Sequence, residues 1–145
     1  MELKIIELNA DKSKEMYGSG NYQMLLKTYD EYYQKMGYNL PWVGYFVIKE
    51  NKIVGSCGFT GQPLEGKVEI AYWTFEEYER QGVSSFSCKG LVFISQQFNP
   101  SIIVTAKTAP EYNASTKILQ NNGFNFAEIV QDDEIGDAWL WTLER

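Results

Sequence analysis

The part of the chain best suited to binding chemistry is a strand, a polar turn, Gly82 and then a helix. A helix N-terminus presents backbone N–H groups without intrahelical partners and the positive end of the helix dipole, so phosphates bind there. Gly82 allows close approach to the backbone, and Ser84 and Ser85 add hydroxyl groups in the first turn. The residue types leave a second interpretation open, in which Gly82 simply begins the helix and the two serines cap it.

The residues around Gly82 exclude two common phosphate-binding motifs. No Gly-Lys-Ser/Thr follows, so this is not a Walker loop, and one glycine cannot supply G-x-G-x-x-G. The chain also contains no histidine, which excludes Ser-His-Asp and Cys-His catalysis and metal sites that depend on imidazole. We therefore expect no metal, and a carboxylate is the natural general base.

The composition is that of an ordinary soluble globular protein. The 145 residues carry a net charge of −6, and 44% of them are hydrophobic, so a single domain over 1–145 is expected. No apolar run reaches the roughly 18 residues of a membrane span, and the first residues lack the features of a secretory signal. We accordingly expect no membrane partner.

The cysteines indicate the cellular location, and the charges indicate the kind of partner. Cys57 and Cys88 are too few for a disulfide framework and lack CxxC spacing, which favours buried, reduced thiols and a cytoplasmic location. The chain has only two arginines and scattered lysines, so the basic stripe that nucleic acid needs is missing. An acidic balance instead suits a cationic partner such as an amine.

The hydrophobic pattern predicts a mixed α/β sheet covered by helices. Val68, Ile70 and Tyr72 alternate with polar or outward positions, as in a half-buried strand, whereas apolar residues recur at helical spacing from Gly82 to Phe98. The run 101–105 is apolar enough for a strand buried on both faces. The expected strands are 3–8, 42–48, 53–60, 67–74, 101–105, 124–130 and 137–143, and the expected helices are 21–36, 82–98 and 112–122.

Two clusters allow more than one interpretation. The tyrosines of helix 21–36, at positions 22, 29, 32 and 33, could line an acceptor pocket, because aromatic faces attract ammonium groups, or could simply belong to the core and its rim. The acidic run 132–134 could bind a cation, but a solvated turn is the expected structure.

Residues 68–85, VEIAYWTFEEYERQGVSS, resemble the acetyl-CoA motif of the GNAT superfamily of N-acetyltransferases, with Tyr72 and Gly82 at the family spacing. The best match is the branch that includes the ribosomal-protein N-terminal acetyltransferases. Residues 113–124, NASTKILQNNGF, resemble that branch's N-x-x-S-x-x-V-L-x-x-x-G-F, with Asn113 one position closer to Ser115 than in the pattern. The likeness runs from about Trp42 to the C-terminus. It implies a mostly antiparallel, twisted sheet of about seven strands in the order β-α-α-β-β-β-α-β-α-β-β.

The resemblance implies transfer of an acetyl group from acetyl-CoA to a primary amine, by direct attack in a ternary complex. Backbone N–H groups from Arg80 to Ser85 would hold the pyrophosphate. The strand edge at Trp73 and Thr74 would pair with the pantetheine amides, and a backbone N–H there would polarise the thioester carbonyl. The expected cofactor-binding residues are Trp73, Thr74, Arg80, Gln81, Gly82, Val83, Ser84, Ser85 and Asn113.

The resemblance also suggests catalytic residues. Glu69 lies on the strand that leads to the motif, where some members of the superfamily carry a catalytic glutamate, so it is the candidate base. Ser115 is the candidate acid for the leaving thiolate, and Tyr112 is a spare donor. The alternatives are a solvent-facing Glu69 beside Lys67 and a Ser115 that only caps a helix.

Three substitutions in the motif support other functions. Glu79-Arg80 replaces the family's Arg-Gly before the glycine, and Phe86 replaces a residue that is usually polar. A degenerate relative that binds CoA without catalysis, or a protein-interaction module, is therefore the alternative. The acceptor stays open between a small-molecule and a peptide amine, and a homodimer through the terminal strands is a further expectation.

Overall fold

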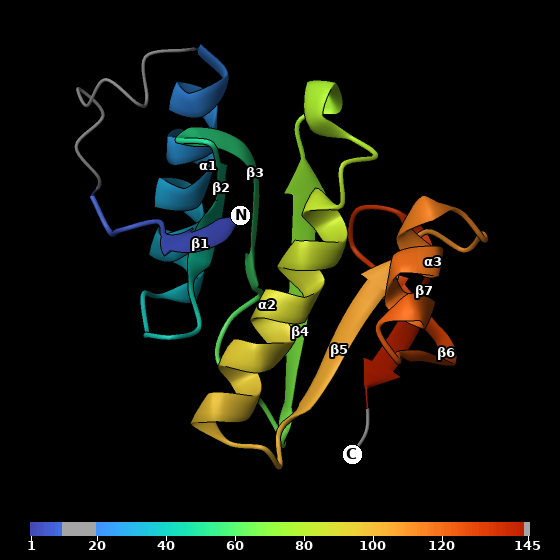
Figure 1. Cartoon of the computed structure of the whole chain (residues 1–145). Helices are drawn as coiled ribbons and strands as arrows, with labels where there is room; N and C mark the ends of the chain where they lie inside the picture. The colour runs from blue at the N-terminus through green and yellow to red at the C-terminus, as the bar shows by residue number, and fades with distance from the viewer. Residues whose placement is uncertain (10–19, 144–145) are drawn as a thin grey trace.

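A single mixed sheet forms the centre of the computed structural model, which describes residues 1–9 and 20–143. Seven strands lie in the order β1-β2-β3-β4-β5-β7-β6, and every neighbouring pair is antiparallel except β4 with β5 (Figure 1). The strands are β1 (Glu2–Ile5), β2 (Gly44–Lys49), β3 (Lys52–Phe59), β4 (Lys67–Thr74), β5 (Ile103–Thr108), β6 (Asn125–Asp132) and β7 (Gly136–Leu143).

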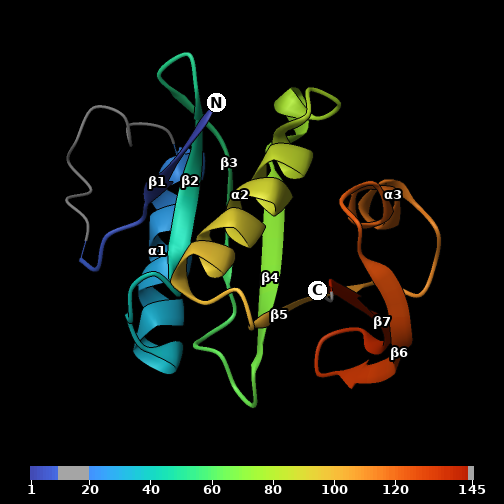
Figure 2. The same ribbon diagram turned by 60° about the horizontal axis from the view of Figure 1, so that its bottom comes forward.

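Helices cover both faces of the sheet. Helix α1 (Gly20–Met36) lies on one face of β2 and β3, and α2 (Val83–Phe98) crosses the opposite face over β3 and β4 (Figure 2). A short 3-10 turn, η2 (Glu76–Tyr78), joins β4 to α2, and α3 (Ala114–Asn121) joins β5 to β6. None of the helices in the described segments is long and apolar enough to cross a membrane.

The core lies where the sheet has a helix on each side. Strands β2 and β3 are buried almost throughout because α1 and α2 cover opposite faces, and Phe46 and Val47 have no exposed surface. Tyr33 ties α1 to the sheet: its hydroxyl donates to the Ile6 carbonyl (2.7 Å) and accepts from the Gly44 N–H (3.0 Å). These bonds fix the helix whose Tyr29 and Tyr32 line a cavity described below.

The feature that creates the site is the separation of β4 from β5. The two parallel strands pair only from Lys67–Ile70 against Ile103–Ala106 and then diverge. Figure 1 shows the resulting V, with the α2 N-terminus beside its β4 arm and α3 beside its β5 arm. Residues 71–74 of β4 therefore have a strand neighbour on the β3 side alone.

The structure confirms the expected fold class, with some differences at element ends. Strand 67–74 and helix 21–36 lie where the pattern predicts them. The expected strand 101–105 is wrong at its start, because β5 begins at Ile103. The Asn99 side chain accepts a bond from the Ser101 N–H (2.9 Å), and this local turn occupies the residues before the strand. Its centre, 104–106, is buried as expected. The resemblance implies two helices between β1 and β2; the described residues there contain α1, and residues 10–19 lie outside the described segments.

Replacing Leu91 by Ala tests the packing of α2 on the sheet. Leu91 is completely buried, so we expect Leu91→Ala to lower the free energy of unfolding by about 2–5 kcal/mol. Phe93 lies on the same helix with 61% of its surface exposed, and Phe93→Ala should change stability by less than about 0.5 kcal/mol. Urea denaturation of both variants measures the difference, and equal losses would contradict the placement of the core.

Candidate active site

The V between β4 and β5 contains a cavity of about 280 Å³. Residues from three elements line it: the ends of the two strands and the N-terminus of α3. The lining residues that matter for chemistry are Tyr72, Lys107, Thr108, Asn113 and Ser115. The tertiary structure thus brings the second resemblance block, at 113–124, against the strand of the first.

The β4 edge of this cavity carries free backbone groups. Thr60 donates to the Glu69 carbonyl and Phe75 to the Val54 carbonyl, so odd-numbered residues of β4 direct their N–H and C=O groups toward β3. The groups of Tyr72 and Thr74 then point to the β5 side, where no strand pairs with them. Trp73 directs its backbone groups to Ser56 on β3, and its side chain is half exposed.

The N-terminus of α2 is uncapped. Gly82 is the N-cap with φ +80°, and no side chain bonds the first-turn N–H groups. A Cβ at Gly82 would meet no atom within 4 Å, so the space beside this first residue of the helix end is open. The two serines are not caps: Ser84 shares a 2.7 Å hydroxyl bond with Thr74, and Ser85 accepts a 3.4 Å bond from Asn122.

The N-terminus of α3 is capped by its own sequence. The Asn113 side-chain oxygen accepts from the N–H groups of Ser115 (2.9 Å) and Thr116 (3.2 Å), while the Thr116 hydroxyl accepts from the Asn113 N–H (2.9 Å). This capping box satisfies donors that a phosphate would otherwise use. The N-cap is thus Asn113 and not Ser115, and Ser115 is among the residues that line the cavity.

Tyr72 joins the two arms of the V. Its hydroxyl donates to the Ser115 carbonyl oxygen at 3.4 Å, and burial raises its pKa well above the ordinary value. The group is therefore a protonated hydroxyl at neutral pH, placed beside Ser115. Reasoning from the sequence used Tyr72 only as a match to the motif; its alternation with Val68 and Ile70 gave no signal of contact with α3.

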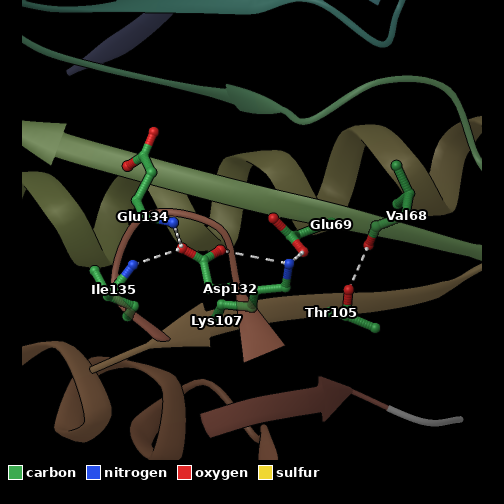
Figure 3. A network of polar contacts seen from close by, with 7 residues as sticks. All are labelled: Val68, Glu69, Thr105, Lys107, Asp132, Glu134 and Ile135. Atoms are coloured by element: carbon green, nitrogen blue, oxygen red, sulfur yellow. Dashed lines mark hydrogen bonds and ion pairs between the residues drawn. The ribbon is translucent and has the colours of Figure 1, made fainter. Parts of the chain in front are cut away.

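Glu69 belongs to a charged network on the α1 face of the sheet (Figure 3). The Glu69 carboxylate lies 3.4 Å from the Lys107 ammonium group, which lies 3.7 Å from Asp132. Asp132 accepts backbone N–H bonds from Glu134 (3.0 Å) and Ile135 (3.3 Å), which lower its pKa. The sequence left open a solvent-facing Glu69 beside Lys67; in the structure this side chain is partly exposed and pairs with Lys107 of the neighbouring strand β5.

The acidic run 132–134 forms a turn held by Asp132. The described residues include no group of three or more His, Cys, Asp or Glu side chains that could hold a metal ion.

Cys57 and Cys88 are buried as expected, and burial raises the pKa of each thiol to about 12, so neither is a nucleophile at neutral pH.

The remaining predicted residues lie around the turn before α2 and near α3. Arg80 and Gln81 are exposed, Arg80 has φ +66°, and Gln81 accepts a 3.0 Å bond from Lys49. Glu79 is also exposed. Tyr112 is 75% exposed, and its ring packs edge-on against that of Trp139, with 4.9 Å between the ring centroids.

A second and larger cavity lies under α1. It has a volume of about 440 Å³ and is lined by that helix together with β3 and β4. Tyr29 and Tyr32 line it, whereas Tyr33 is in the core and Tyr22 donates to the Ile53 carbonyl. The tyrosines of α1 therefore divide between the two interpretations that the sequence left open.

Replacing Asn113 by Ala tests whether this residue caps α3. We expect Asn113→Ala to lower the free energy of unfolding by about 1 kcal/mol, with no ligand present, because two N–H groups lose their acceptor. Asn113→Asp keeps an acceptor and should keep most of the stability. Thermal melting of both variants measures this, and an Ala variant as stable as the parent would exclude the capping role.

Comparisons with known proteins agree with this geometry. The model of the acetyltransferase (GNAT) domain matches residues 5–125. No curated protein sequence matches the chain.

Three solved structures illustrate the fold similarity. The ribosomal L7/L12 alpha-N-protein acetyltransferase RimL in complex with coenzyme A is 19% identical, with 84% of this chain and 70% of that chain covered and a TM-score of 0.65. An acetyltransferase from Salmonella typhimurium that modifies the N-terminal serine of L7/L12 is 18% identical (87% and 75% covered, TM-score 0.64). The ribosomal-protein-S18-alanine N-acetyltransferase from Escherichia coli is 13% identical (80% and 77%, TM-score 0.61).

These structural likenesses show the fold, and the match of the domain model over most of the chain shows the family. The chain therefore belongs to the GNAT family and is an N-acetyltransferase that moves an acetyl group to an amine.

Proposed function

We propose that this acetyltransferase uses acetyl-CoA as its co-substrate and acetylates a primary amine by direct attack, with Glu69 as the general base. One observation carries the proposal: the uncapped N-terminus of α2 lies at the same end of the V as the unpaired edge of β4. A ligand that has both phosphates and amide groups satisfies both sets of free backbone donors and acceptors.

The residues present suit acetyl-CoA. The first-turn N–H groups of α2, with those of Arg80 and Gln81, would hold the pyrophosphate, and the open space at Gly82 would admit it. The Thr74 and Tyr72 backbone groups would pair with the pantetheine amides, beside the predicted Trp73. Asn113 would support this site indirectly, through the helix that it caps. When bound, acetyl-CoA supplies the activated acetyl group.

Glu69 is placed to accept a proton from the acceptor amine. Lys107 lies 3.4 Å from its carboxylate and holds it in position on the sheet. An α-amino group, with an ordinary pKa near 7.7–8.0, gives up its proton more readily than a lysine near 10.4. An ion-paired carboxylate, acting directly or through water, is therefore sufficient for such an amine.

Ser115 is the proposed acid for the leaving thiolate. Ser115 lines the cavity in the V, and Tyr72, another residue with a hydroxyl group, lines the same cavity. Tyr112 ranks below both because it is largely exposed, packs against Trp139 and is not among the residues that line this cavity.

The acceptor is a small-molecule or peptide amine. Two of the structural neighbours are described as acting on ribosomal proteins, which supports a peptide N-terminus as one source. A single domain, a cytoplasmic location, a homodimer through the terminal strands and the lack of a nucleic-acid partner remain predictions from the sequence.

The melting temperature with and without acetyl-CoA separates the proposed enzyme from a degenerate relative. At 100 times Kd, a ligand of the native state adds about 2.7 kcal/mol, which should raise the midpoint by several degrees. Gly82→Asp should abolish this shift by placing a carboxylate among the phosphate donors. Gly66→Asp is the matched control, since Gly66 has nearly the same φ and equally open space but lies at the opposite end of β4.

Removing the proposed base gives a second prediction. Glu69→Gln should lower kcat by about 100-fold or more, because the neutral amide cannot accept the proton. The melting shift with acetyl-CoA should stay as in the parent, and Glu128→Gln, on the exposed face of β6, should keep full activity. Unchanged turnover in Glu69→Gln would remove this carboxylate from the mechanism.

A further inference from the structure

The cavity under α1 differs in character from the V. Its volume of about 440 Å³ is in the range of small-ligand sites, roughly 300–1,000 Å³. Its walls are largely apolar and aromatic, and none of the described residues that line it is charged. Those that shape it are Leu25, Tyr29, Tyr32, Phe59, Ala71 and Trp73.

The hydroxyl groups of this cavity do not change that character. Tyr32 donates to the Phe59 carbonyl at 2.7 Å, and Thr28 donates to the Met24 carbonyl at 2.9 Å. Burial raises the pKa of Tyr29 and of Tyr32 to about 12, so both rings stay neutral at physiological pH. A charged substituent inserted here would find no opposite charge to offset its desolvation.

The α1 cavity adjoins both the proposed base and the V. Glu69, Ala71 and Trp73 alternate along β4, so their side chains share the α1 face at a spacing of about 7 Å. Thr60 lines both this cavity and the neighbouring depression that contains Glu69. Ala71 lines both this cavity and the one in the V. A group seated under α1 thus has the carboxylate at one end and the cofactor cleft at its side.

The charges around Glu69 do not favour a polycation. Lys107 contacts Glu69 and Asp132, and Lys67 lines the same depression as Glu69. Glu69 therefore already has a cationic partner in Lys107, which competes with a second ammonium group of a polyamine for this carboxylate.

We propose that the α1 cavity binds an uncharged aromatic or aliphatic group of the acceptor, so that the substrate is a monoamine whose nitrogen is joined to that group by a short linker. This inference rests on the proposed function. The same chemistry occurs in a free arylalkylamine and in the N-terminal residue of a peptide that begins with an apolar side chain.

An acceptor panel at fixed acetyl-CoA tests the inference. 2-Phenylethylamine and the peptide Phe-Ala-Ala represent the two sources, and spermidine and Lys-Ala-Ala are the charged competitors. We expect kcat/KM for at least one apolar amine to exceed that of both charged amines by about tenfold or more. The better of the two apolar amines identifies the source. Equal or faster acetylation of spermidine or Lys-Ala-Ala overturns the inference but leaves the proposed function intact.

Substitutions at one helix position locate the binding site. Thr28 is exposed at the rim of the cavity, so Thr28→Asp should raise KM for the preferred apolar amine by about tenfold, while Thr28→Val should not. Lys27→Asp places an aspartate on the preceding, exposed residue of α1, which does not line the cavity, and serves as the control. Equal KM values in Thr28→Asp and Lys27→Asp would overturn the assignment to this cavity.

Melting shifts show whether a negative result contradicts the inference about the acceptor or the proposed function itself. If neither apolar amine is turned over or stabilises the protein while acetyl-CoA does, the inference about the acceptor is wrong. If acetyl-CoA itself gives no shift, the proposed function fails first.

Discussion

The divergence of β4 from β5 is the constraint on which the site depends. Parallel pairing ends at Ile70 and Ala106, so the backbone groups of Tyr72 and Thr74 have no strand partner on that side. Backbone donors and acceptors at a partly buried edge need partners, and a continued sheet would have supplied them. Tyr72 spans the opening by its bond to the Ser115 carbonyl, while β5 is held by antiparallel pairing with β7. The cleft is thus a built-in interruption of the sheet.

The N-termini of α2 and α3 both lie at this opening, and they differ in their capping. Asn113 and Thr116 close the donors of α3 with a capping box, whereas Gly82 begins α2 without any side-chain acceptor. The free first-turn donors of α2 have the dipole and the geometry for an anion. The two polar segments that resemble family motifs thus differ: one caps its own helix, and the other leaves the first-turn N–H groups of α2 without a side-chain acceptor.

The chain has no histidine, so the base that we propose is a carboxylate, that of Glu69. It pairs with a lysine from the adjacent parallel strand. Lys107 also reaches Asp132, whose backbone bonds fix the turn between β6 and β7. The Glu69 carboxylate is therefore positioned by residues of three strands. In our proposal, the apolar cavity beyond Ala71 selects the group attached to the amine.

The sequence by itself determined the elements and the motif. Alternation at 67–74 and helical spacing at 83–98 are local patterns, so they survive without tertiary information. Gly82 and Glu69 could be named for the same reason, from the motif that they belong to. Element ends were less certain where a side chain competes with the backbone, as Asn99 does before β5 and Asn113 before α3.

Only the tertiary structure decided which residues meet. The partnership of Glu69 with Lys107 joins positions 38 residues apart, and the bond of Tyr72 to Ser115 joins positions 43 apart. Neither follows from spacing, because both depend on the place where two parallel strands separate. The division of the tyrosines into core and cavity lining likewise depends on how α1 lies on the sheet. Local periodicity can be recognised from the sequence, whereas contacts between strands depend on how the sheet is assembled.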